Sequence, residues 1–122
     1  MIFDHIVLIV SNGEQSKDFY SHALRPLGIT LIREEDQCIG FGSNGKPSLW
    51  VCEEDNPQKP MHIAFIAEDR KSVDAFYDAA IAVGGKDNGK PGIREHYHPH
   101  YYGAFVIDPD GHNIEAVCRK PA

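Results

Sequence analysis

The chain has 122 residues, the length of one domain or of two very small modules that share a core. Its hydrophobic fraction of 42% and charged fraction of 25% are those of an ordinary soluble globular protein. The formal net charge of −6 and the pI of about 5.5 argue against nucleic acid and membranes as partners, because nucleic acids and anionic membrane surfaces both require clustered Lys and Arg side chains.

The cysteines and the first residues bear on the cellular compartment. Cys38, Cys52 and Cys118 cannot all pair within one chain, and each lies inside an apolar run. The simplest interpretation is three buried free thiols in a reducing compartment. The opening run MIFDHIVLIV has no basic segment before it and is too short to span a bilayer. We therefore expect a cytoplasmic protein.

The chain opens with a predicted strand and helix. Residues 2–10 are apolar and β-branched, which is typical of a strand. Ser11 and Glu14 have the spacing of a capping box, and the apolar residues after them recur at helical intervals. A helix is therefore expected from this point to about Leu24.

Three short strands and a linker are expected next. The turn Ser43-Asn44-Gly45 predicts that the last two strands form a hairpin. Residues 54–60 are polar, rich in proline and without periodicity, so they predict a linker between a first module of about residues 1–53 and a second of about residues 61–120. The strand candidates are residues 29–33, 37–41 and 48–52.

The pattern then restarts. Residues 5–28 overlay residues 62–85 without a gap at an offset of 57, with seven identities in 24 positions. In this overlay His5 falls on His62. The second helix is expected over residues 72–83, with Asp69 as its N-cap.

The ends of the two halves match at a larger offset. Residues 39–52 overlay residues 105–118 at an offset of 66, so that Gly45 falls on Gly111. The rise from 57 to 66 means that the second half holds nine extra residues, in the segment GIREHYHPHYYG. Each half is therefore predicted to be β-α-β-β-β, and the loop that departs from the repeat is a candidate functional loop.

The closing hairpin of the second half carries a carboxylate in mid-strand. The run Asp108-Pro109-Asp110-Gly111 predicts a turn between two apolar segments, and His112 beside it is expected to be exposed or to make a weak contact at the rim of the site. Alternation in the strand that follows puts Glu115 on one face together with Asn113 and Val117. A carboxylate among apolar residues is costly to bury unless it is paired or bound to a cation.

Two histidines are candidate partners of this carboxylate. His5 and His62 occupy the same position of the leading strand in the two halves, and such positions can approach each other across a pseudo-twofold axis. With Glu115 they would form a facial metal triad that leaves positions open for substrate. The alternative is that Glu115 forms a salt bridge to Arg94 or Arg119 and that the histidines are ordinary core residues.

The first half offers no fourth ligand. At the offset of 66 the equivalent of Glu115 is Leu49, and a register slip of one residue would put Trp50 in its place. Neither side chain binds a metal, so three protein ligands are favoured over four.

The extra loop is rich in groups that transfer protons. Its histidines and tyrosines suit a substrate lid or a proton-transfer set, and they suit a polar, aromatic dimer contact equally well. A separate metal site within the loop is less favoured than the triad because Pro99 interrupts the local spacing. The residues concerned are Glu95, His96, Tyr97, His98, His100, Tyr101 and Tyr102.

These features together resemble the vicinal oxygen chelate superfamily, which includes glyoxalase I, the fosfomycin and bleomycin resistance proteins and the extradiol dioxygenases. The resemblance covers essentially the whole chain and lies in the paired repeat, in FDHI with His5, in MHIAF with His62, and in DPDGHNIE ending in Glu115. It implies an α+β fold of two tandem βαβββ modules in a curved mixed sheet around a metal site. It also implies a divalent metal (iron, zinc, nickel or manganese) held by these three residues, and a homodimer that often shares modules across its interface.

The resemblance further implies a metal-dependent lyase or dioxygenase that acts on a small substrate held through two adjacent oxygens. Glyoxalase I has a second metal-binding glutamate where Leu49 stands here, so dioxygenase- or transferase-type chemistry is favoured over lactoylglutathione lyase. The catalytic candidates are Glu115 and, for proton transfer, His98, Tyr101 and Tyr102. The alternative function is a metal-free module that sequesters a drug-like ligand, as bleomycin resistance proteins do.

Overall fold

The computed structural model describes residues 3–56 and 58–122. Each half of the chain folds as a strand, a helix and three further strands. The first half comprises β1 (Ile6–Val10), α1 (Gly13–Ala23), a 3-10 turn η1 (Arg25–Leu27), β2 (Thr30–Glu35), β3 (Cys38–Ser43) and β4 (Lys46–Glu53). The second comprises β5 (His62–Ile66), α2 (Arg70–Ala82), β6 (Lys86–Ile93), β7 (Tyr102–Ile107) and β8 (Asn113–Cys118).

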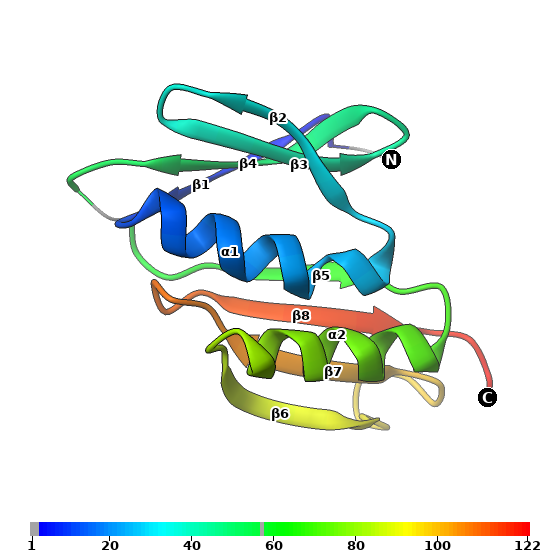
Figure 1. The fold of residues 1–122 in the computed structure, drawn as a ribbon. Helices are drawn as coiled ribbons and strands as arrows, with labels where there is room; N and C mark the ends of the chain where they lie inside the picture. Colours follow the sequence, from blue (N-terminus) through cyan, green and yellow to red (C-terminus); the bar gives the residue numbers. More distant parts are fainter. Residues whose placement is uncertain (1–2, 57) are drawn as a thin grey trace.

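Each half forms its own four-stranded mixed sheet. The strand orders are β1-β4-β3-β2 and β5-β8-β7-β6, so the first strand of each half runs parallel to the last, and the other neighbours are antiparallel. Figure 1 shows the two sheets one above the other, with α2 lying over β7 and β8. The predicted α+β fold of two βαβββ modules is confirmed, with two sheets in place of one continuous sheet.

Both helices begin at a side-chain cap, and one cap lies one residue from its predicted position. Asp69 caps α2 as predicted, accepting a hydrogen bond from the backbone N–H of Ser72. The cap of α1 is Asn12, whose side chain accepts from the N–H of Gln15. Ser11 does not cap the helix, and its own N–H donates to the carboxylate of Asp110 in the other module.

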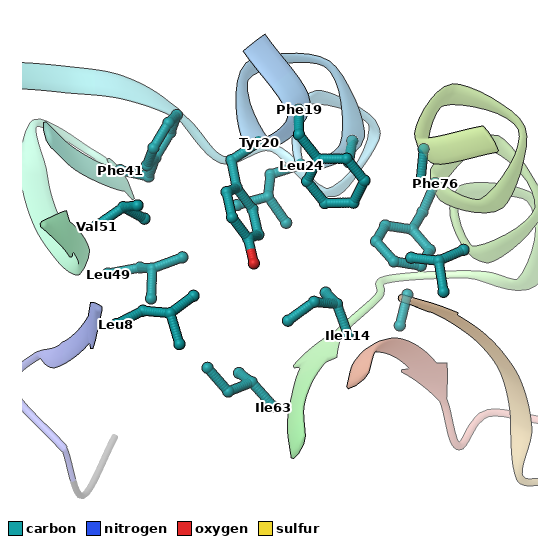
Figure 2. Close-up of a cluster of buried hydrophobic side chains, with 14 of the residues drawn as sticks. Leu8, Phe19, Tyr20, Leu24, Phe41, Leu49, Val51, Ile63, Phe76 and Ile114 are labelled. Carbon is teal, nitrogen blue, oxygen red and sulfur yellow. The ribbon is translucent and has the colours of Figure 1, made fainter. Parts of the chain in front are cut away.

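One apolar core joins the two modules. Four side chains point into the same cluster, two from each sheet: Leu8, Leu49, Ile63 and Ile114 (Figure 2). Each helix adds a fully buried phenylalanine at equivalent repeat positions, Phe19 and Phe76. Because successive residues of a strand point to opposite faces, the other face of each sheet is turned away from this core.

The prediction of three free thiols is wrong for two of them. Cys38 and Cys52 lie opposite each other in the register of β3 and β4 and form a disulfide. Cys118 is free and buried, as predicted. The strand register that brings the pair together depends on the hairpin, which the spacing of 14 residues alone does not reveal. Cys38 and Cys52 therefore give no support to the expectation of a reducing compartment.

A buried histidine ties the modules together. His112, expected to be exposed, is fully buried. Its Nδ1 accepts a hydrogen bond from the N–H of Met61, so the proton is on Nε2, which lies 3.3 Å from the carbonyl oxygen of Ile9. The imidazole thereby connects the edge of β1 to the start of β5. Among the helices of the described ranges, none has the length and apolar character needed to cross a membrane.

Candidate functional site

The strand register identifies the residue of the first module that corresponds to Glu115. Val7 of β1 pairs with Trp50 of β4, and the equivalent Ala64 of β5 pairs with Glu115 of β8. Trp50 is therefore the counterpart of Glu115, and the choice of Leu49 is wrong by one residue. Leu49 faces the common core instead. The conclusion that the first module lacks a fourth ligand at this position is unaffected.

Glu115 is buried with both carboxylate oxygens hydrogen-bonded. The side chain is 1% exposed, Nε2 of His62 lies 2.7 Å from Oε1, and the hydroxyl of Tyr101 donates to Oε2. His62 reaches the carboxylate because β5 runs beside β8, and Tyr101 reaches it from the end of the extra loop. These contacts compensate the cost of burying a carboxylate. The alternative salt bridge to Arg94 or Arg119 is not formed.

Tyr101 is held in its protonated form. Burial, the hydrogen bond to Glu115 and the negative charge of that carboxylate raise the pKa of Tyr101 to about 12, although the nearby guanidinium of Arg119 opposes the shift. At neutral pH the phenol therefore remains a hydrogen-bond donor and fixes the orientation of the carboxylate.

The carboxylate opens onto a cavity of about 470 Å³, which we call the Glu115 cavity. Tyr97 is 59% exposed, and its ring centroid lies 5.0 Å from that of Tyr101. The guanidinium carbon of Arg119 lies 4.9 Å from the centroid of the same Tyr101 ring. The cavity is lined by His62, His96, Tyr97, Tyr101, Glu115 and Arg119.

Arg119 was not predicted to line the site, although the sequence contains a signal for it. It lies four residues after Glu115, and strand alternation places both residues on one face. The extra loop lies in the cavity wall through His96, Tyr97 and Tyr101, in agreement with its prediction as a candidate functional loop.

His5 does not meet the His62–Glu115 pair. It precedes β1, and its Nδ1 lies 2.8 Å from a carboxylate oxygen of Asp4. The two sheets turn their core faces towards a shared cluster, so His5 and His62 lie on separate outer faces. In the part of the chain that the structure describes, no three His, Cys, Asp or Glu side chains are placed to hold one metal ion. The three-ligand site stays a prediction.

Two further catalytic candidates lie away from the cavity. Tyr102 is the first residue of β7, and strand alternation turns it to the opposite face from Phe105, where its hydroxyl donates to Asp74 of α2 at 2.6 Å. Nδ1 of His98 accepts a hydrogen bond from the backbone N–H of His100. Neither Tyr102 nor His98 lines the Glu115 cavity.

The donor atoms beside the cavity fit a divalent metal in part. An imidazole nitrogen and a carboxylate oxygen lie side by side, and both are ligands that zinc, iron, nickel and manganese accept. Catalytic metal sites usually have three protein ligands. His62 and Glu115 supply two of them, so a third ligand has to come from outside this pair.

The comparison with protein families decides the family. The family model described as the Glyoxalase/Bleomycin resistance protein/Dioxygenase superfamily matches residues 2–116. The chain belongs to this superfamily. Its name covers enzymes and a binding protein alike, so it does not fix one activity. A search of curated proteins found no match.

Solved structures of superfamily proteins resemble the chain over nearly its whole length. A glyoxalase/bleomycin resistance protein from Albidiferax ferrireducens T118 is 28% identical with a TM-score of 0.86, and the match covers 98% of this chain and 100% of that one. A glyoxalase/bleomycin resistance protein/dioxygenase family enzyme from Burkholderia phytofirmans PsJN is 17% identical with a TM-score of 0.72, over 96% and 98% of the two chains. Oxidase ChaP-H2 is 21% identical with a TM-score of 0.72, over 98% and 94%. At these lower identities the last two show a shared fold.

Proposed function

We propose that the chain is a divalent-metal-dependent enzyme acting on a small substrate held through two adjacent oxygens, with His62 and Glu115 as two of the metal ligands. The observation that carries this proposal is a buried carboxylate whose Oε1 lies 2.7 Å from an imidazole nitrogen at the wall of a cavity. A bound divalent metal would supply Lewis-acid stabilisation of negative charge that develops on the substrate oxygens.

The other groups at the cavity have separate roles in this proposal. Tyr101 keeps its proton and holds Oε2 of Glu115, which leaves Oε1 directed towards His62. Of the two described histidines that line the cavity, His96 is not engaged with Glu115, so it is the candidate to accept or release a proton at a ring nitrogen. Trp50 occupies the position at which glyoxalase I would have its second metal-binding glutamate. This difference supports dioxygenase- or transferase-type chemistry over lactoylglutathione lyase.

We further propose that His5 of a second copy supplies the third ligand in a homodimer. The outer faces that carry the two histidines also expose large apolar side chains. Val7, on the face of His5, is 46% exposed, and Ile66, on the face of His62, is 83% exposed. Exposed apolar side chains beside polar ligands are typical of a surface that another chain covers.

Elemental analysis of protein purified without chelator tests the metal site. Wild type is expected to hold a stoichiometric divalent metal, and Glu115→Gln and His62→Ala are expected to lose most of it, with circular dichroism confirming the fold. His22→Ala is the matched control, since His22 is an exposed histidine of α1. Metal-free wild type, or a metal content unchanged in the variants, would contradict the proposal. Tight binding of a drug-like ligand by metal-free protein would then favour the sequestering alternative.

Mixing two defective variants tests the shared site. His5→Ala and Glu115→Gln are each expected to lose metal as homodimers. In a mixed dimer with sites built across the interface, one site carries both substitutions and the other carries neither. Metal content should therefore reappear on mixing after the dimers exchange subunits. No recovery in mixed dimers verified by native mass spectrometry would place all three ligands within one chain or exclude His5.

A further inference from the structure

Among the described residues that line the Glu115 cavity, one side chain is a permanent cation. Of its six lining residues, Arg119 carries a fixed positive charge, Glu115 is the one carboxylate, and the rest are two histidines and two tyrosines. The whole chain has a net charge of −6, so its overall field repels anionic ligands. An arginine placed at the wall of this cavity is therefore the local group able to attract an anion.

The guanidinium of Arg119 is positioned by the ring of Tyr101, and its hydrogen-bond donors are available to a ligand. It lies over the face of Tyr101, 4.9 Å from the ring centroid, while the hydroxyl of that ring reaches Glu115. Tyr101 thus contacts the cation through the face of its ring and the carboxylate through its hydroxyl. Among the described residues Arg119 has no carboxylate partner in an ion pair, so its hydrogen-bond donors face solvent and the cavity.

Arg94, the residue that follows β6, differs from Arg119 because its hydrogen-bond donors are engaged within the protein. Its guanidinium lies over Phe105 at 5.4 Å, but its two terminal nitrogens donate to the backbone carbonyls of Gly92 at 2.9 Å and Lys90 at 2.7 Å. These bonds hold the bulged strand β6. Arg94 therefore has a structural role, whereas the donors of Arg119 are left for a ligand.

The aromatic wall beside Arg119 suits a flat molecule. Tyr97 is largely exposed, and its ring lies 5.0 Å from Tyr101 and 4.1 Å from His96, centroid to centroid. Exposed rings at the wall of a cavity offer a stacking surface to a planar ligand. An aliphatic acid would gain less from this surface than an aromatic one.

We infer that Arg119 is the specificity-determining residue for a small aromatic carboxylic acid, whose carboxylate pairs with the guanidinium while the opposite edge of its ring faces Glu115 and His62. The planar guanidinium fork matches a carboxylate with two parallel hydrogen bonds. It also offsets the repulsion between an anionic substrate and Glu115. The position of the two adjacent oxygens at that opposite edge rests on the proposed function, whereas recognition of the carboxylate does not.

Calorimetric binding of 3,4-dihydroxybenzoate and 3,4-dihydroxybenzamide tests the inference, because the two probes share the ring and both hydroxyls and differ in having an anionic carboxylate or a neutral amide. Wild type should bind the acid about tenfold more tightly than the amide. Arg119→Gln should bring that ratio to about one, with the larger loss of affinity for the acid, and Arg119→Lys should retain part of the preference. Arg94→Gln is the matched control and should keep the wild-type ratio.

Equal binding of the two probes by wild type, a preference that survives Arg119→Gln, or binding of neither probe would each overturn the inference. Metal content measured on the same samples, and titrations repeated after chelation, separate this failure from that of the proposed function. Metal-loaded protein without a preference for the acid contradicts the inference alone. Metal-free protein that still prefers the acid through Arg119 contradicts the metal-dependent function alone.

Discussion

The two modules place different side chains at one pair of facing positions. In the first module Gly40 of β3 pairs with Trp50 of β4, and a Cβ built on Gly40 would lie 3.0 Å from the indole. In the second module the equivalent pair is Phe105 and Glu115. The aromatic ring lies on β4 in the first module and on β7 in the second, where a carboxylate occupies the facing position on β8. One large ring covers this part of each sheet, and only the second module gains an ionisable group.

The connection between the second and third strands also differs. In the first module two residues, 36–37, join β2 to β3, whereas residues 94–101 join β6 to β7. The longer connection ends in Tyr101, which hydrogen-bonds the buried Glu115. An insertion in one module thus supplies the partner that a buried carboxylate requires. A repeat can therefore keep its core while one copy is specialised through a single exchange of side chains and a longer loop.

The largest expected effect comes from truncating one core side chain in each module to alanine. Phe19 and Phe76 fall on each other in the repeat, and both are fully buried in the shared cluster. Phe19→Ala and Phe76→Ala should each lower the free energy of unfolding by about 3–5 kcal/mol. Urea denaturation monitored by circular dichroism and by Trp50 fluorescence should give coincident transitions for each variant. Separate transitions would show that the modules unfold independently and would contradict a single core shared by both modules.

The disulfide makes the first module different from the second, where the strand register places Val117 at the position of Cys52 and the neighbouring Cys118 is a buried free thiol. Reduction should lower the free energy of unfolding by about 3 kcal/mol, given the short loop that the Cys38–Cys52 bond closes. Urea titrations with and without reductant measure the difference, and Cys38→Ser/Cys52→Ser should be insensitive to reductant. Denatured, unreduced wild type should expose one thiol to Ellman's reagent. Three reactive thiols before reduction would contradict the pairing.

Tyr101 makes the second module sensitive to alkaline pH. Its pKa is raised to about 12 by burial and by Glu115, against about 10 in an unfolded chain. Between these two pH values the folded state binds more protons than the unfolded state. The contribution of the protonated Tyr101 to the free energy of unfolding is therefore fully present below pH 10 and is lost as the pH rises towards 12. Wild type should therefore lose stability more steeply than Tyr101→Phe in this window. Ultraviolet titration should show one late-ionising tyrosine fewer in the variant than in wild type, since burial and the nearby Asp108 also raise the pKa of Tyr20. A midpoint near 10 for Tyr101 would contradict its contact with Glu115.

Local pattern was enough to predict the fold and the partner of the key carboxylate. The repeat predicted two equivalent modules, and alternation with a costly buried charge pointed from Glu115 to His62. The sequence did not reveal which way the two sheets face each other, because that depends on how side chains of both modules pack into one core. For this reason the approach of His5 within one chain could not be tested before the structure. Register errors of one residue, as with Leu49 and Trp50, reverse the face of a side chain, so pattern alone left that equivalence open.

The smallest expected difference lies in the two hairpin turns. Gly45 and Gly111 are repeat equivalents with positive φ angles of 76° and 90°. Among the described residues other than its chain neighbours, a Cβ at Gly45 would meet no atom within 4 Å, and one at Gly111 would meet Cγ of Pro60 at 3.9 Å, so backbone strain should decide the cost of substitution. Gly45→Ala and Gly111→Ala should each lower the free energy of unfolding by about 1 kcal/mol.

Asparagine substitutions at the same two positions are the matched controls. They should cost less than alanine, because asparagine tolerates the left-handed region, as Asn44 with a φ of 56° already does beside Gly45. Equal costs at both turns in urea denaturation would show that the hairpins are the same structural unit. A Gly111→Ala cost well above that of Gly45→Ala would instead show that the hairpin leading into Glu115 is held by its surroundings, where Asp108 accepts from the N–H groups of Asp110 and His112. The specialisation of the second module would then extend beyond the site face into the turn.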